Sequence, residues 1–107
     1  MKKVEAYVKA HRVDEVTLAL HKINRLGGMT VSEARGVGRG HPADHGFDEY
    51  HRIARIEVFC LDELAEPVVE TIEKAAHTGL RGDGKVYVLP VENAVRISSG
   101  ERGCEAV

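Results

Sequence analysis

Apolar residues recur along this chain at two different spacings, and the order of these spacings restricts the folds that it can adopt. Where they alternate with polar residues, a strand covered on one side is expected, because successive side chains of a strand point to opposite faces. In the first such segment Val4, Ala6 and Val8 share one face. The segments predicted to be strands are residues 3–9, 29–36, 53–60 and 85–91.

Two further segments place apolar residues at every third or fourth position, which is typical of an amphipathic helix. The first begins at Val13 and is expected to stop at Gly27 and Gly28. The second has Asp62 as a candidate N-cap. A helix that begins there loses one backbone hydrogen bond at Pro67, whereas a helix that begins at Glu66 loses none. The apolar stripes are Val13, Val16, Leu20 and Ile23 in the first helix, and Ala65, Val68, Ile72 and Ala75 in the second.

The resulting order, βαββαβ, predicts an α+β protein of the ferredoxin-like class, with both helices on one face of an antiparallel sheet. Pro90 indicates that the last strand lies at an edge or contains a bulge. The face without helices is expected to be either solvated or buried against other copies of the chain, and we favour burial. Its residues include Tyr7 and Phe59, interleaved with Glu5, Arg55 and Glu57.

Composition limits the classes of function. The 107 residues are 43% apolar and 30% charged, as in a single globular domain. The net charge of −2 favours neither nucleic acid nor an anionic membrane as a partner, and the sequence contains no apolar run long enough to span a bilayer. A cytoplasmic protein is expected. Cys60 is predicted to lie in the core, whereas Cys104 is either a redox-active thiol or without a role.

A loop with three glycines, "HTGLRGDGK", precedes the last predicted strand. Glycine reaches positive φ without a steric clash, so a tight turn is one explanation of these glycines. Alternatively, its backbone N–H groups bind the phosphates of a ligand, helped by Arg81 and Lys85. No set of residues suited to catalysis is found, and we expect no enzymatic activity.

Four stretches of the sequence resemble the PII signalling proteins: "MKKVEAYVKAHRVDEVTLAL", "GGMTVSEARGVGR", "RIEVF" and "HTGLRGDGKVYVLPVENAVRISSGE". The similarity extends over nearly the whole chain. It implies a ferredoxin-like protomer, a homotrimer, and an adenine nucleotide (ADP, AMP or ATP) in each cleft between subunits. It also divides the single domain into a T-loop (about residues 37–52), a B-loop (about 78–85) and a C-terminal tail (about 98–107).

The resemblance assigns nucleotide-binding residues position by position. Gly82, Asp83, Gly84 and Lys85 correspond to the phosphate loop, and Arg96 approaches the phosphates from the neighbouring subunit. The stretch at the base of the T-loop that frames adenine and ribose corresponds to Gly36, Gly38 and Arg39. The remaining positions that line the nucleoside pocket are Thr30, Glu57, Phe59 and Thr78.

Two departures from the family pattern bear on the ligand. Gly40 replaces the glutamine that helps to hold magnesium between ATP and 2-oxoglutarate, and Ser98 replaces a second arginine. Loss of a cation weakens a triphosphate site more than a site for fewer phosphates. ADP or AMP is therefore expected to bind as well as ATP, or better, and the need for magnesium stays open. Bicarbonate is an alternative second ligand, held by Arg39 and Gly40.

The T-loop is shorter than the family pattern, and Tyr50 does not match the tyrosine that is modified in the family. Its histidines, His41, His45 and His51, raise the alternative of a metal-responsive trimer similar to the divalent-cation tolerance proteins. Their spacing matches no compact metal site, so a solvated loop is favoured. The expected function is regulation of a partner, such as a membrane transporter or an enzyme, through the T-loop.

Overall fold

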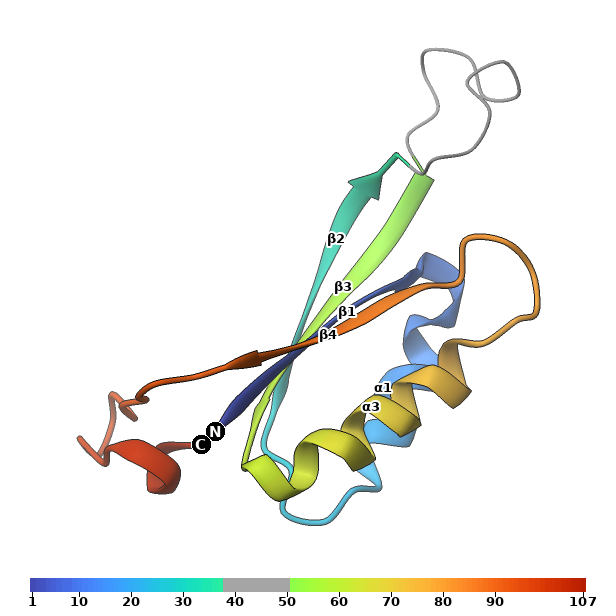
Figure 1. Cartoon of the computed structure of the whole chain (residues 1–107). Helices are drawn as coiled ribbons and strands as arrows, with labels where there is room; N and C mark the ends of the chain where they lie inside the picture. The colour runs from blue at the N-terminus through green and yellow to red at the C-terminus, as the bar shows by residue number, and fades with distance from the viewer. Residues whose placement is uncertain (38–50) are drawn as a thin grey trace.

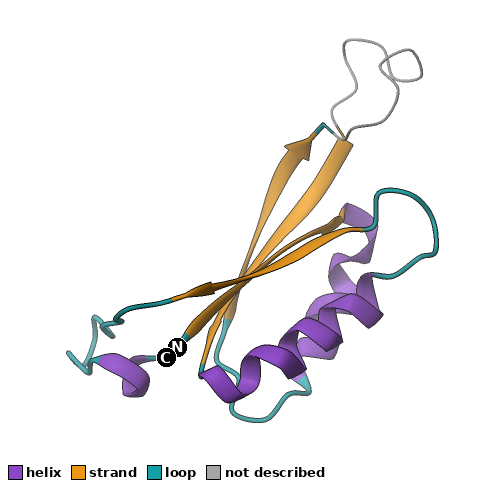
Figure 2. Ribbon diagram, in the orientation of Figure 1, coloured by secondary structure: helices purple, strands orange, loops and turns teal. Residues whose placement is uncertain are grey.

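The computed structural model describes residues 1–37 and 51–107, and their element order confirms the ferredoxin-like plan. Helices α1 and α3 lie side by side on one face of a four-stranded sheet, and the other face carries no helix (Figures 1 and 2). The elements are β1 (Lys2–Lys9), α1 (Val13–His21), β2 (Met29–Gly36), β3 (His51–Cys60), α3 (Asp62–Ala76) and β4 (Gly84–Pro90), with short 3₁₀ helices at Ala10–Arg12 and Gly103–Ala106.

The strands are arranged in the order β2-β3-β1-β4, and all neighbouring strands are antiparallel. Gly36 pairs with His51 at one end of the sheet, and Val8 pairs with Gly84 at that same end. The T-loop and the B-loop therefore leave the same end of the sheet, from opposite edges. Pro90 pairs with the start of β1 at the other end, and its position on an edge strand confirms the edge interpretation.

The core lies between the sheet and the two helices. The predicted inward faces of β1 and β3 are confirmed, because Val4, Val8 and Ile56 are almost completely buried. Cys60 is also buried, as predicted, and burial raises the pKa of its thiol because the thiolate is poorly solvated there. The core residues contributed by the helices are Val16 and Leu20 of α1, and Leu64, Val68, Ile72 and Ala76 of α3.

The first helix ends earlier than its sequence suggested. It stops at His21, and the next residues turn through i→i−3 hydrogen bonds, such as that from the Ile23 N–H to the Leu20 carbonyl at 3.1 Å. Arg25 rather than a glycine adopts the left-handed conformation, with φ of 66°. The reason is tertiary, because Leu26 packs against the core and draws the chain away from the helix axis before the glycines are reached.

The second helix begins at Asp62, and Leu61 rather than Asp62 occupies the N-cap position. The carboxylate of Asp62 instead accepts a hydrogen bond from the N-terminal amine at 2.7 Å. Pro67 lies inside this helix and removes one backbone hydrogen bond. A helix that began at Glu66 would leave Leu64 outside it, although the Leu64 side chain is buried in the structure. Burial of such a side chain contributes about 2 kcal/mol, which offsets the lost bond.

Three loop boundaries differ from those expected. Strand β3 already begins at His51, so the last two T-loop residues belong to the sheet. Gly84 and Lys85 are likewise the first residues of β4. The C-terminal tail contains a 3₁₀ helix at Gly103–Ala106, and a β-bridge joins Arg102 to Val95. Strand pairing continues into residues 51–52 and 84–85 because a partner strand remains within hydrogen-bonding distance there.

Candidate functional site

The glycines of the B-loop adopt backbone conformations that other residues rarely occupy. Gly79, Gly82 and Gly84 have φ values of 82°, 81° and 106°. Gly84 has a second constraint, because a Cβ atom on it would lie 1.7 Å from the carbonyl oxygen of Tyr7 in the neighbouring strand. The chain thus makes a tight turn, and the backbone of β4 approaches β1 more closely than any side chain at residue 84 would allow.

Asp83 closes the B-loop by accepting hydrogen bonds from the beginning of the same loop. Its Oδ2 accepts from the N–H groups of Thr78 at 2.8 Å and Gly79 at 3.2 Å, and its Oδ1 accepts from the Thr78 hydroxyl. The ammonium group of Lys9, at the end of β1, lies 3.2 Å from Oδ1 and donates to Thr78 Oγ1 at 3.3 Å. The carboxylate of Asp83 is therefore engaged inside the loop and maintains its shape.

The same contacts make the stability of the protein depend on pH. The hydroxyl and N–H of Thr78, followed by Lys9 and Gly79, hold the pKa of Asp83 well below its usual value. A carboxylate with a lowered pKa in the folded state contributes stability above about pH 4, and this contribution is lost as the pH falls toward its folded-state pKa. We expect Asp83→Asn to be less stable than the wild type at neutral pH, with a difference that shrinks below about pH 4.

Urea unfolding of both proteins between about pH 7 and pH 2 measures this effect. The wild type should lose stability relative to Asp83→Asn as Asp83 becomes protonated. A difference that stays constant over the whole range would show that ionisation of this carboxylate contributes nothing to the fold.

Beyond Thr78 and Gly79, the B-loop presents backbone donors that have no acceptor among residues 1–37 and 51–107. Within the described part of the chain, no hydrogen bond is found for the N–H groups of Arg81 and Gly82, whereas the turn at residues 81–82 directs the Asp83 N–H toward the Leu80 carbonyl. The side chains of Arg81 and Lys85 flank these groups, are exposed, and form no ion pair with any described residue. Successive N–H groups beside two cations make a binding site for an anion such as phosphate.

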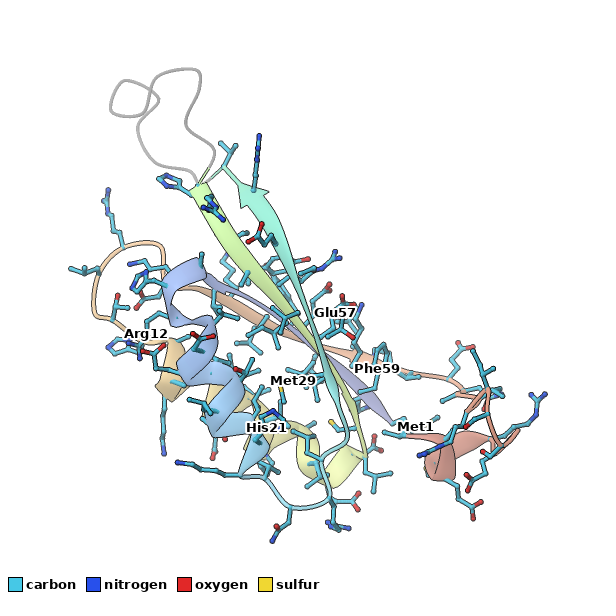
Figure 3. All side chains as sticks on the ribbon, turned by 180° about the vertical axis from the view of Figure 1, so that it is seen from behind. Met1, Arg12, His21, Met29, Glu57 and Phe59 are labelled. Carbon is cyan, nitrogen blue, oxygen red and sulfur yellow. The ribbon has the colours of Figure 1, made fainter. Side chains whose placement is uncertain are left out.

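The helix-free face of the sheet carries a paired charge cluster beside an aromatic ring. Glu57 is contacted by Lys3 Nζ at 2.9 Å and by Arg55 Nε at 3.4 Å, and the hydrogen bond from Lys3 is the main cause of its lowered pKa. The Lys3 ammonium lies 5.8 Å from the ring centre of Phe59. Thr30 pairs with Glu57 across β2 and β3. Figure 3 shows Glu57 and Phe59 pointing away from the helices, so three of the expected nucleoside-pocket residues share one face.

Arg96 lies far from the B-loop within one chain. It follows the end of β4 opposite the B-loop, and the seven residues of β4 separate the two places by about 20 Å. A compact turn holds it: its N–H donates to the Glu101 carbonyl at 2.8 Å, and its carbonyl accepts from the Gly100 N–H at 2.7 Å. Half of its side chain is exposed, and its Nε lies 3.8 Å from a Glu101 carboxylate oxygen. A single protomer does not bring Arg96 and Lys85 together.

The remaining predicted residues belong to the T-loop or to its base. Gly36 is the last residue of β2, where a Cβ atom would lie 3.1 Å from Cδ1 of Ile53. His51 lies opposite Gly36 in the sheet. No cluster of three potential metal ligands is found among residues 1–37 and 51–107. Six residues named in the sequence analysis lie outside the described part of the chain: Gly38, Arg39, Gly40, His41, His45 and Tyr50. The second-ligand and metal hypotheses that depend on them remain predictions.

Comparison with known proteins identifies the family. The family model of the nitrogen regulatory protein P-II matches residues 1–101. This chain belongs to the PII family. PII proteins of Azospirillum brasilense and Rhodospirillum rubrum are 46% and 45% identical to it, over the full length of both chains in each case. The crystal structure of Arabidopsis thaliana PII bound to citrate has a TM-score of 0.85 and 39% identity, covering 99% of this chain and 91% of that one.

Membership of the PII family makes this chain a nitrogen regulatory signalling protein rather than an enzyme. The alignments with the two bacterial PII proteins extend over 114 residues, whereas this chain has 107, so these relatives contain positions that it lacks. A membrane-crossing helix is not found in the described part of the chain, where every helix is too short or too polar.

One residue of the site, Lys9, was not predicted from the sequence. Lys9 is the last residue of an alternating strand, and no local pattern distinguishes it from the other lysines of β1. The antiparallel register of β1 and β4 is what brings it beneath the B-loop. Arg81 was recognised as a flanking charge but was not assigned to the phosphate loop. Its exposure beside unpaired N–H groups now adds it to the candidate site.

Proposed function

We propose that this PII protein is a homotrimer that senses adenine nucleotides in the clefts between its subunits. The observation that carries the proposal is the pair of N–H groups at Arg81 and Gly82, which have no acceptor in the described part of the chain. The side chains of Arg81 and Lys85 flank them and form no ion pair with residues 1–37 or 51–107. The hydrogen bonds of Asp83 hold this backbone in place, so little ordering is needed when a phosphate binds. A polyphosphate ligand fits donors and charges of this kind.

The requirement for more than one subunit rests on the position of Arg96. The B-loop and Arg96 lie at opposite ends of β4, so they can act on one ligand only if they come from different chains. A cyclic assembly joins unlike surfaces of neighbouring subunits and repeats the same cleft around the ring. The helix-free face is suited to such an assembly, because the charges of Lys3, Arg55 and Glu57 are already paired and can be covered without isolating one of them.

The ligand preference follows from the cations available. Ser98 is exposed and supplies no charge where a second arginine is expected, so ADP or AMP is proposed to bind as well as ATP or better. The second ligand is a small anion, either bicarbonate or 2-oxoglutarate, held near Arg39 and Gly40. Magnesium is involved only if 2-oxoglutarate is that ligand.

The regulatory output is proposed to pass through the T-loop. The T-loop, which follows Gly36, and the B-loop leave the same end of the sheet, so a nucleotide bound at the B-loop lies at the same end of the molecule as the base of the T-loop. A ligand that contacts both loops binds some T-loop conformations more tightly than others. It therefore shifts the T-loop population toward the conformations that it binds best. A transporter or an enzyme that recognises one conformation is then bound or released.

Two measurements on the purified protein test this proposal. Light scattering coupled to gel filtration should give three times the chain mass of 11.7 kDa. Isothermal titration calorimetry with AMP, ADP and ATP, each with and without magnesium, bicarbonate and 2-oxoglutarate, should show binding of at least one nucleotide. Bicarbonate-enhanced ADP or AMP binding would identify an inorganic-carbon effector, and magnesium-dependent ATP binding with 2-oxoglutarate would identify the other anion. A monomer, or a trimer that binds none of the nucleotides, would refute the proposal.

A further inference from the structure

The B-loop contains a negative charge at the place where an anion is proposed to bind. The carboxylate of Asp83 belongs to the same short loop as the unpaired N–H groups. Uncompensated, a carboxylate so close to a phosphate would repel it, and each additional phosphate charge would increase the repulsion. Some other group must offset this charge if the loop is to bind a nucleotide.

Lys9 is placed to offset it. Its ammonium group lies 3.2 Å from Asp83 Oδ1 and 3.3 Å from Thr78 Oγ1, so it joins both ends of the loop to the end of β1. The side chain also passes beneath the loop, since its Cε would be 3.9 Å from a Cβ placed on Gly82. About a fifth of each side chain of the pair is exposed, 21% for Lys9 and 22% for Asp83. This pair is therefore less screened by solvent than a surface ion pair.

Other described cations do not replace Lys9. His77 Nδ1 lies 3.6 Å from Asp83 Oδ2, but its side chain is 72% exposed and it carries a charge only when protonated. Arg12 is engaged elsewhere, because its guanidinium donates two hydrogen bonds to the Ala75 carbonyl at the end of α3. Lys9 is thus the permanently charged group in contact with Asp83 among the described residues.

We propose that Lys9 is a positioning residue of the nucleotide site, which fixes the B-loop through Asp83 and Thr78 and cancels the charge of Asp83 toward phosphate. This inference rests on the proposed nucleotide function and deepens it. It gives Asp83 and Lys9 a joint role: the carboxylate shapes the loop with its hydrogen bonds, and the ammonium makes that carboxylate compatible with an anionic ligand.

The test uses the substitution Lys9→Met, which keeps the length of the side chain and removes its charge. We expect calorimetry to show affinity for ATP lowered about tenfold, a smaller loss for ADP and the smallest for AMP, because the repulsion grows with phosphate charge. Lys9→Arg should bind nearly as tightly as the wild type. In the double variant Lys9→Met/Asp83→Asn the affinity losses for ATP, ADP and AMP should become similar, because the uncompensated charge is gone. Lys74→Met, an exposed position on α3, is the control.

Amide hydrogen exchange of the nucleotide-free protein provides a second readout. Lys9→Met should accelerate exchange at the Thr78 and Gly79 amides, which donate to Asp83, and leave the amides of β3 unchanged. Equal affinity losses for all three nucleotides in Lys9→Met, or a double variant in which ATP still loses more affinity than AMP, would overturn the charge role. Unchanged exchange at Thr78 and Gly79 would overturn the positioning role. If the wild type binds no nucleotide, the proposed function fails, while the exchange experiment still tests how Lys9 acts on the loop.

Discussion

Replacing Gly84 by alanine should destabilise the fold by more than about 4 kcal/mol, which is exceptional for a single methyl group. The added Cβ would lie 1.7 Å from the Tyr7 carbonyl oxygen and 2.8 Å from the Tyr7 carbonyl carbon. Both are backbone atoms of β1, which pairs with β3 on one side and β4 on the other and cannot move aside. The φ of 106° adds strain of its own.

Urea unfolding followed by circular dichroism measures this loss, and two other glycines separate its causes. Gly28→Ala meets no atom within 4 Å and has an ordinary backbone conformation, so its effect should stay within about 0.5 kcal/mol. Gly100→Ala also meets no atom, but its φ of 77° should cost about 1–2 kcal/mol. A Gly84→Ala protein as stable as Gly28→Ala would contradict the close approach of β4 to β1.

The second large effect concerns the two halves of the nucleotide site. Lys85→Gln and Arg96→Gln should each weaken nucleotide binding by about 10- to 100-fold, the range expected when a charge-assisted hydrogen bond is lost. Neither should unfold the protein, because both side chains are exposed. Calorimetry with the preferred nucleotide measures the loss, and Arg102→Gln, an exposed neighbour of Arg96 in the C-terminal segment, is the matched control.

Mixing the two defective proteins should restore binding, and this is the decisive part of the experiment. If Lys85 and Arg96 of one site come from different subunits, some clefts of a mixed trimer contain both native residues. When equal amounts assemble at random, each of the two subunits at a cleft supplies its native residue in half of the cases. About one cleft in four then contains both native residues. The mixture, unfolded and refolded together, should regain about that fraction of high-affinity sites. A mixture that stays as defective as its components would mean that each subunit carries a complete site, or that Arg96 takes no part in binding.

Much of the fold could be predicted from the sequence, because its signals act between near neighbours. The alternation in residues 3–9 identified the buried face of β1, and the helical stripe around Val68 and Ile72 identified the buried side of α3. The boundaries of the helices could not be predicted in the same way. Leu64 extends α3 backward past Pro67, and Leu26 ends α1 before its glycines, because each gains burial against residues distant in the sequence.

The phosphate-loop motif, likewise, could be predicted from the sequence only in part. The glycines and flanking charges of the B-loop are recognisable in the sequence, since the backbone conformations that a turn demands favour glycine locally. The role of Asp83 is not recognisable there, because its partner Lys9 lies on another strand. The ammonium of Lys9 donates to Thr78, 69 residues further along the chain, and the register of β1 with β4 is what brings them together. Strand register is a property of the packed sheet, so no local pattern in the sequence reports it.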